Sequence, residues 1–437
     1  MPSSSYSPSP APEATEKKNK KNLSSLLDAA LPFLRSEPHL VDPELPRMIA
    51  AIISVGAGEC WHKDNCFLGH LTDVYRILKL WGAPDPVARC GLFHSVYSNS
   101  YVDLAIFDPA GGGRELLRSL AGAAAERLVH LFCIVPRQTL IHDDLLFRYS
   151  ETELIDHLRQ SQASVCRARE ENLLDSSEPW RRKLAFVLPA GGVTVKHIKT
   201  GEDVALSRSI VATFLLMTMA DFSDQLYAFQ DELFENDDGR MDFSGNAPAA
   251  IWPGDGRPGL WMNSLSRMGA IYTLIVREEE LYSHKKNMTE EEEEEQRDND
   301  LALVVPPVFE SCTMVLGREE QRAARDLYWE AMAAPAAGKK EMGAVEEMMR
   351  ESCERNGFVG EPHLVLGQVY MGQGRYEEAE REAAEGLRLL LEWGSSWDKR
   401  MSWEGWVAWG RLILQKAKAR SWPATSFGVI GLGLVRN

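Results

Sequence analysis

The segment Gly69-His70-Leu71-Thr72-Asp73-Val74 places a histidine on a regular apolar pattern, four residues before Val74 and seven before Ile77. Apolar residues at these offsets line one face of an α-helix. We therefore expect the imidazole of His70 to point along that face into the core, and the fold around it to be helical. A buried imidazole needs partners for its ring nitrogens. The segment thus predicts either a structural hydrogen bond or a binding site.

Two more polar residues fall on helix faces that otherwise carry apolar side chains. His94, in Gly91-Leu92-Phe93-His94-Ser95, is expected within the next helix, from about Val87 to Tyr97. Asp221 follows Ala220 in a third helix, where a carboxylate is costly unless something pairs with it. One divalent metal would satisfy all three side chains. Each alone also has a simpler explanation, a histidine bonded to a carbonyl or an aspartate paired with an arginine.

Composition predicts a soluble globular protein. A chain of 437 residues with 44% hydrophobic content can bury a sizeable core and has room for two or three domains. The net charge of −16 argues against nucleic acid or an anionic membrane as a partner, because both require concentrated positive charge. No run reaches the roughly twenty apolar residues that a membrane-spanning helix needs.

The cysteines and the N-terminal segment bear on location. Seven scattered cysteines are typical of free thiols in a reducing compartment. We expect an intracellular protein, most simply a cytoplasmic one. The serines of the N-terminal segment leave a plastid as an alternative, and its basic cluster Lys17-Lys18-Asn19-Lys20-Lys21 leaves the nucleus.

Four parts are expected along the chain. Residues 1–22 are rich in Ser and Pro and should form a disordered tail. Residues 23–283 should form a helical domain and 301–437 a second helical module. Between them, 284–300 has the composition of an acidic linker or loop.

A small β-hairpin is expected near 184–204, inside the first helical domain. The β-prone runs are 185–188 and 193–198, and the Pro- and Gly-rich segment 189–192 between them has a turn composition. At the other end of the chain, the apolar tail 424–435 is expected to be docked, because an exposed segment of that kind favours aggregation.

The second module carries a repeat pattern. Small and aromatic residues recur at the spacing of a tetratricopeptide repeat, in which small side chains let two antiparallel helices touch. These residues are Leu366, Gly367, Tyr370, Gly374, Tyr376, Ala379 and Ala383. The pattern resembles one such unit from about Glu361 to Trp393, and a protein partner is expected at 361–417.

Five tryptophans crowd the segment that follows this unit: Trp393, Trp397, Trp403, Trp406 and Trp409. Aromatic side chains serve both packing and recognition. The tryptophans therefore either pack the final helices against the rest of the chain or line a groove for a peptide.

The three polar residues also carry a family resemblance. His70, the pair His94-Ser95 and Ala220-Asp221 resemble the order of ligands in the HD hydrolase superfamily, which are a His, a His-Asp pair and a later Asp, and in particular the guanosine tetraphosphate hydrolase domains. More narrowly, 66–135 with 219–222 resembles a plant and algal family built on a domain of unknown function. The resemblance covers about 23–234. It implies a mainly α, HD-like helical bundle that holds manganese, iron or zinc.

The departures from the HD pattern bear on activity. Ser95 stands where the pair has an aspartate, and the residues that follow it, Val96-Tyr97-Ser98-Asn99, replace acidic residues that handle protons in the nucleotide hydrolases. A serine hydroxyl is a weak, neutral ligand, although two histidines and one carboxylate still resemble facial iron or manganese sites. His62, Asp73 and Asp224 are candidates for the shell behind the ligands.

Two interpretations follow, and no residue is assigned a catalytic role in either. In the first, the chain is a non-catalytic or weakly catalytic protein with a degenerate HD-like metal pocket and a repeat-based interaction module. In the second, it is a divalent-metal-dependent phosphohydrolase that acts on a nucleotide or another small phosphorylated anion. The missing aspartate at position 95 favours the first.

Overall fold

The computed structural model describes residues 22–99, 106–234, 236–240, 256–286, 301–311, 315–333 and 339–432. All but the last residue of the predicted N-terminal tail, and most of the predicted acidic linker 284–300, lie outside these residues. The described chain is mainly helical, with two small antiparallel sheets of two strands each. The predicted mainly α fold is confirmed.

The first part of the chain supplies the helices α1 (Leu23–Leu34), α2 (Leu45–Ser54), α3 (Phe67–Leu80), α4 (Asp85–Phe93), α5 (Gly113–Ala121), α6 (Ala123–Ile134), α7 (Glu151–Glu171), α8 (Pro179–Val187), α9 (Arg208–Asp224), α10 (Phe229–Phe234) and α11 (Met262–Lys286). Short turns of helix join them: η1 (Pro38–Leu40), η2 (Ala57–Glu59), η3 (Gln138–Asp143) and η4 (Leu146–Arg148). The C-terminal part supplies α12 (Pro307–Ser311), α13 (Arg318–Ala333), α14 (Lys339–Arg355), α15 (Glu361–Gln373), α16 (Tyr376–Trp393), α17 (Trp403–Lys418) and α18 (Ser426–Ile430).

The long helices begin where the sequence provides caps. At α7, the hydroxyl of Ser150 accepts from the backbone N–H of Glu153, whose carboxylate accepts in turn from the N–H of Ser150. At α9, Ser207 accepts from the N–H of Ile210. Each cap satisfies backbone donors that the first turn of a helix leaves without partners.

The two sheets are hairpins. Strand β1 (Trp61–His62) pairs with β2 (Asn65–Cys66), and β3 (Val193–Lys196) pairs with β4 (Asp203–Leu206). The second hairpin confirms a hairpin in the expected region but corrects its strands, because 185–187 belong to α8. The reason is a helical period: Trp180 and Leu184, four residues apart, are both fully buried, whereas Phe186 is exposed.

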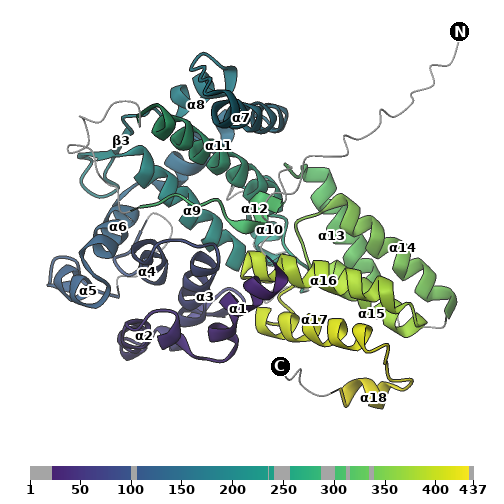
Figure 1. Cartoon of the computed structure of the whole chain (residues 1–437). Coiled ribbons are helices and arrows are strands. Elements are labelled where there is room, and N and C mark those ends of the chain that lie inside the picture. Colours follow the sequence, from purple (N-terminus) through teal and green to yellow (C-terminus); the bar gives the residue numbers. More distant parts are fainter. Residues whose placement is uncertain are drawn as a thin grey trace, which may run out of the picture.

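Helices α9 and α11 run through the middle of the molecule and contact each other (Figure 1). Helices α3 and α4 pack on α9, and α6 packs on α4. On the opposite side, α7 packs along α11. Every residue of α9 from Ile210 to Ala220 is buried, in keeping with a sequence that is apolar except for Thr213 and Thr218.

The C-terminal helices lie against this body and not apart from it. Helix α16 contacts α17, α15, α1, α12 and α3, so α1 at the start of the described chain and α17 near its end meet on one helix (Figure 1). Helices α15 and α16 form a close hairpin: a Cβ on Gly386 would lie 2.6 Å from the carbonyl oxygen of Gly360.

Four of the five C-terminal tryptophans are buried, namely Trp393, Trp397, Trp403 and Trp406. The ring of Trp393 lies 6.2 Å from that of Trp81 on the helical body, and the indole N–H of Trp81 donates to the carbonyl of Glu392. Of the two uses expected for these side chains, the structure shows packing.

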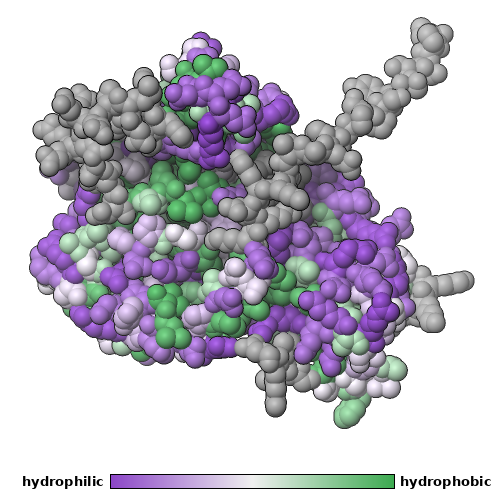
Figure 2. Space-filling model, in the orientation of Figure 1, coloured by the Kyte–Doolittle hydropathy of each residue, from purple (hydrophilic) through white to green (hydrophobic). Residues whose placement is uncertain are grey.

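Hydrophilic residues cover most of the surface seen in Figure 2, with small hydrophobic patches between them. The predicted docking of the tail is wrong for α18, because Phe427 and Ile430 are 84% and 82% exposed. That helix has five residues, too short to present a continuous apolar face to the body. Over the described residues, no helix combines the length and apolarity needed to cross a bilayer.

Candidate metal centre

His70, His94 and Asp221 meet in the core. One ligand atom from each of the three side chains lies within 4.8 Å of the other two, and the Nε2 atom of His70 lies 3.3 Å from Oδ1 of Asp221. Both histidines are almost completely buried, and 15% of the Asp221 side chain remains exposed. Within the described residues, this is the group of His, Cys, Asp and Glu side chains arranged to share one ion.

Three helix ends deliver these side chains. His70 lies in the first turn of α3, where the Sγ atom of Cys66 accepts from the N–H of Gly69. Asp221 lies in the last turn of α9. The expected helix from Val87 to Tyr97 is shorter than predicted: α4 ends at Phe93, and His94 is its C-terminal cap. Because the C-terminal ends of α4 and α9 carry partial negative charge, both favour a cation between them.

A glycine brings α3 and α4 together beside the cluster. Gly91 lies one turn before His94, and a Cβ built on it would be 2.4 Å from Cδ1 of Leu78 and 3.2 Å from Cγ1 of Val74. Any larger residue would force Leu78 to shift. The position therefore sets the distance between His70 and His94.

Hydrogen bonds at Nδ1 orient both imidazoles. His94 donates from Nδ1 to the carbonyl of Gly91, at 2.7 Å, and His70 from Nδ1 to Oδ2 of Asp224, also at 2.7 Å. These bonds leave Nε2 of each ring facing the cluster. Metal-binding histidines have this arrangement, in which a carbonyl or carboxylate holds the second nitrogen.

The protonation states differ between the two rings. Burial lowers the pKa of His94 to about 4, so this imidazole is neutral at pH 7 and its Nε2 carries a lone pair. Burial acts in the same direction on His70, but hydrogen bonds to Asp221 and Asp224 raise its pKa to about 9. The pKa of Asp221 is well below its usual range, because hydrogen bonding and the nearby histidines outweigh its burial. Without an ion, His70 is therefore an imidazolium held between two carboxylates.

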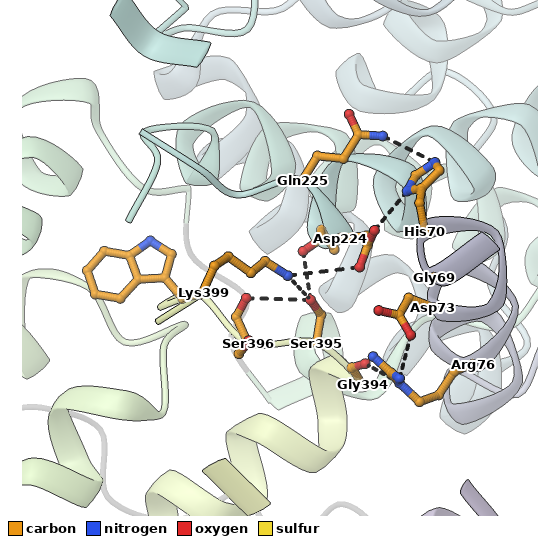
Figure 3. A network of polar contacts seen from close by, with 12 residues as sticks. Gly69, His70, Asp73, Arg76, Asp224, Gln225, Gly394, Ser395, Ser396 and Lys399 are labelled. Atoms are coloured by element: carbon orange, nitrogen blue, oxygen red, sulfur yellow. Dashed lines mark hydrogen bonds and ion pairs between the residues drawn. The ribbon is translucent and has the colours of Figure 1, made fainter. Parts of the chain in front are cut away.

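The three residues expected behind the ligands take different places. Asp224 contacts His70 directly, as described. The ring of His62, on the first hairpin, lies 4.4 Å from that of His70 and covers the cluster, and burial together with His70 and Lys63 lowers its pKa to about 3. Asp73 points away from the ligands, toward Arg76, with which it forms an ion pair of 2.6 Å (Figure 3).

Ser95 is buried next to the cluster. Its hydroxyl accepts a hydrogen bond of 3.0 Å from the amide of Asn99. The oxygen at the position of the expected aspartate is thus neutral and already has a donor partner. Neutral hydroxyl oxygens bind transition metals more weakly than carboxylates do.

Sequence reasoning missed three groups around the cluster. The amide of Gln225 contacts Nε2 of His70 at 3.3 Å and also donates to Asp221. Its position four residues after Asp221 is a detectable helix spacing. Lys63 interacts with Asp221 and Asp224, and Lys399 lies 3.9 Å from Asp224. No local pattern signals Lys399, because it comes from the far end of the chain.

Figure 3 shows how the C-terminal part reaches the cluster. Lys399 donates to the hydroxyl of Ser395, which in turn donates to the carbonyl of Ser223 on α9. Arg76 of α3 donates to the carbonyl of Gly394. The loop between α16 and α17 therefore forms one wall of the shell behind His70.

The donor set fits a transition-metal ion better than calcium or magnesium, which prefer oxygen ligands. Ligand atoms about 2.1 Å from such an ion lie roughly 3 to 3.5 Å from one another. The separation of 3.3 Å between His70 and Asp221 already meets this requirement. The largest separation, at most 4.8 Å, has to close by roughly 1.5 Å around an ion.

A family model described as a domain of unknown function (DUF6817) matches residues 51–137. The matched segment contains His62, His70 and His94, whereas Asp221 lies outside it. No curated protein matches the chain. No solved structure matches it either.

Proposed function

We propose that this protein binds one divalent transition-metal ion, manganese, iron or zinc, through His70, His94 and Asp221. One observation carries the proposal: both histidines have Nδ1 engaged by another partner, and a ring nitrogen of each lies within 4.8 Å of the same carboxylate. A histidine that serves only the core needs no such convergence. The cost of burying Asp221 is then offset by two positive charges on the ion.

Metal analysis of the purified full chain tests the proposal. We expect about one equivalent of metal in the wild type after loading with manganese, ferrous iron or zinc, and a loss of most of it in His70→Ala and Asp221→Ala. His142→Ala is the matched control. His142 is equally buried and donates from Nδ1 to the carbonyl of Gly239, but it lies outside the cluster.

Two results would remove the proposal. One is a wild type that retains only trace metal after loading with each of the three ions. The other is a metal content that falls equally in His142→Ala and in the two cluster variants, because that loss would follow from general destabilisation.

We further propose that the centre is non-catalytic or weakly catalytic. Ser95, at the position of the second carboxylate of HD hydrolases, has a neutral hydroxyl bonded to Asn99. The centre then has one carboxylate ligand, and the carboxylate of Asp224 beside it is engaged by Nδ1 of His70. Its role is to hold α3, α4 and α9 together, as a structural ion does.

A phosphohydrolase is the second candidate, and Lys63 and Lys399 near the cluster favour it. Burial lowers the pKa of Lys63 to about 8, while Asp221 and Asp224 keep its ammonium charge. An ammonium beside an ion can hold a phosphate oxygen, and the ion can activate water. Metal-loaded protein should then release phosphate from nucleotides with or without a 3′-phosphate, and Lys63→Ala should slow the release. If the metal-loaded wild type releases no phosphate, the phosphohydrolase is excluded and the non-catalytic function stands.

A protein partner at 361–417 also remains part of the proposal, supported by the close hairpin of α15 and α16. Because four tryptophans of the region are buried, a partner would meet exposed side chains of α15 and α16 such as Gln368 and Arg381. A partner should co-purify with the full chain and be lost from the double variant Gln368→Arg, Arg381→Glu. If the double variant recovers as much partner as the wild type does, binding through these two residues is excluded.

The protein is further proposed to be intracellular, as the described cysteines support. Cys60, Cys66, Cys90, Cys133, Cys166 and Cys353 are all free thiols. Fluorescence microscopy of a tagged full chain distinguishes the cytoplasm from a plastid and from the nucleus.

A further inference from the structure

His62 has a buried ring nitrogen beside the metal cluster. It lies on β1, and the chain turns at Lys63 and Asp64 into β2. Among the residues that the structure describes, no group forms a hydrogen bond with the buried Nε2 atom of His62. A buried polar atom in this state is costly unless a ligand satisfies it. An ion in the neighbouring cluster is a group that can accept its lone pair.

The hairpin turns His62 toward the cluster. Successive residues of a strand face opposite sides: Trp61 is 62% exposed, whereas the ring of His62 lies 4.4 Å from that of His70. The hairpin also sits close to the first turn of α3, because a Cβ on Gly69 would collide with the side chain of Asn65 in β2. The glycine before His70 thus lets the hairpin approach the metal ligands.

The distances between the imidazole rings fit a shared ion. Two imidazoles that bind one tetrahedral ion through nitrogens at about 2.1 Å have ring centroids roughly 5 Å apart. The ring centroids of His70 and His94 are 5.2 Å apart, and those of His62 and His70 are 4.4 Å apart. His62 therefore already lies as close to His70 as a common ion requires.

Binding of an ion by His62 requires a further movement of the hairpin. The ligand atoms that lie within 4.8 Å of one another belong to His70, His94 and Asp221, and His62 is not in this group. The hairpin has two residues in each strand and packs on α3 and η2. A two-stranded hairpin of this size is only marginally stable by itself. It can therefore close on an ion while the three helices that carry the other ligands stay in place.

Building on the metal centre proposed above, we propose that Nε2 of His62 is the fourth ligand of its ion and that this ion is zinc. The neutral hydroxyl of Ser95 already accepts from Asn99, so the helices supply three ligands. His62 completes a set of three histidines and Asp221. Four protein ligands leave no open position, as in structural zinc sites, and a tetrahedral set rich in nitrogen selects zinc over manganese.

His62→Phe tests the proposal, because phenylalanine keeps an aromatic ring over His70 but has no nitrogen for the ion. Cobalt(II) is the spectroscopic probe in place of zinc, since its visible absorption changes when an imidazole ligand is exchanged for water. In the full chain, we expect His62→Phe to bind cobalt with an altered spectrum. We expect its zinc affinity, measured by competition with a chelating dye, to fall at least about tenfold. Free imidazole added to His62→Ala should restore the spectrum of the wild type.

Trp61→Ala is the matched control, because it changes the exposed face of the same hairpin. Its cobalt spectrum and zinc affinity should equal those of the wild type, and an equal loss in Trp61→Ala and His62→Phe would overturn the proposal. The same cobalt spectrum and zinc affinity in the wild type and His62→Phe would also overturn it, while a centre of three ligands would stand. A wild type that takes up neither cobalt nor zinc would remove the fourth ligand together with the metal centre itself.

Discussion

The two histidines of the metal centre differ in the group that accepts the hydrogen bond from Nδ1. His94 donates to a backbone carbonyl, whereas His70 donates to a carboxylate that Lys399 approaches in turn. A carboxylate partner makes an imidazole more basic and a stronger ligand. The two histidines should therefore contribute unequally to metal affinity.

The first prediction concerns Asp224. Replacing it with Asn keeps the size of the side chain but removes the charge that orients His70, so we expect metal affinity to fall about 10- to 100-fold. Competition with a chelating dye of known affinity measures the change. Asp73→Asn is the control, since Asp73 pairs with Arg76 and not with a ligand. An equal fall in both variants would contradict the role given to Asp224.

A second prediction concerns Glu361, which is buried between the helical body and the last helices. Its Oε1 atom accepts from the N–H groups of Trp397 and Asp398, at 2.6 and 3.2 Å. Burial and the nearby charge of Asp398 nevertheless raise its pKa to about 7. Because the folded pKa lies above the unfolded one, this group stabilises the fold most in acid, and the contribution is lost as the pH rises through 7.

Glu361→Gln should remove this dependence. The free energy of unfolding of the variant minus that of the wild type should increase between pH 5 and pH 8, by on the order of 2 kcal/mol. Urea unfolding at the two pH values measures the difference. Glu354→Gln, at an exposed position, should show no such trend. A wild type and a Glu361→Gln variant with parallel pH profiles would show that Glu361 is ionised in the fold throughout this range.

At the scale of elements, the close contact between α3 and α4 depends on a glycine, Gly91. Gly91→Ala places a methyl group 2.4 Å from Leu78 Cδ1, and Leu78 is fully buried. Overpacking of this kind costs about 1 to 3 kcal/mol. It should also weaken metal binding, because His94 moves with the end of α4.

The same substitution elsewhere provides the comparison. A Cβ on Gly343, in α14, meets nothing within 4 Å. Gly343→Ala should therefore leave metal affinity unchanged and stabilise its helix by up to about 1 kcal/mol. Thermal unfolding together with metal titration of both variants tests the prediction, and it is wrong if Gly91→Ala binds metal as the wild type does.

The elements also show where sequence patterns mislead. Residues 185–188 have β-prone side chains, yet 185–187 end α8, because Trp180 and Leu184 are buried in the core at helical spacing. The helix expected to run to Tyr97 ends at Phe93, and Nδ1 of the next residue, His94, donates a hydrogen bond to the carbonyl of Gly91. Both departures arise from contacts between residues that propensities treat separately.

For the whole molecule, the helical body and the C-terminal helices should unfold together. Trp81, the C-terminal cap of α3, packs against Trp393 and donates to the carbonyl of Glu392. Arg76 of α3 donates to the carbonyl of Gly394 and to the carboxylate of Glu404. Truncation of a buried tryptophan costs about 3 to 5 kcal/mol. Trp81→Ala should lower the stability of both parts by this amount in one transition.

Denaturation followed by far-UV circular dichroism and by tryptophan fluorescence measures this, since five of the 12 tryptophans lie between Trp393 and Trp409. The two signals should coincide in wild type and variant. Trp422→Ala, at a half-buried position near the C-terminal end, should cost less. Two separate transitions in the wild type would show that the parts are independent.

The mainly helical fold and the three polar residues on apolar faces could be inferred from the sequence, because helix periodicity and the cost of burying a charge are local properties. The distance between Nε2 of His70 and Asp221, the partners at each Nδ1, and the approach of Lys399 to Asp224 could not. These depend on how α3, α4 and α9 pack and on a loop some 170 residues beyond α9. Tertiary packing alone brings such distant residues together, so it converts three costly side chains into one candidate site.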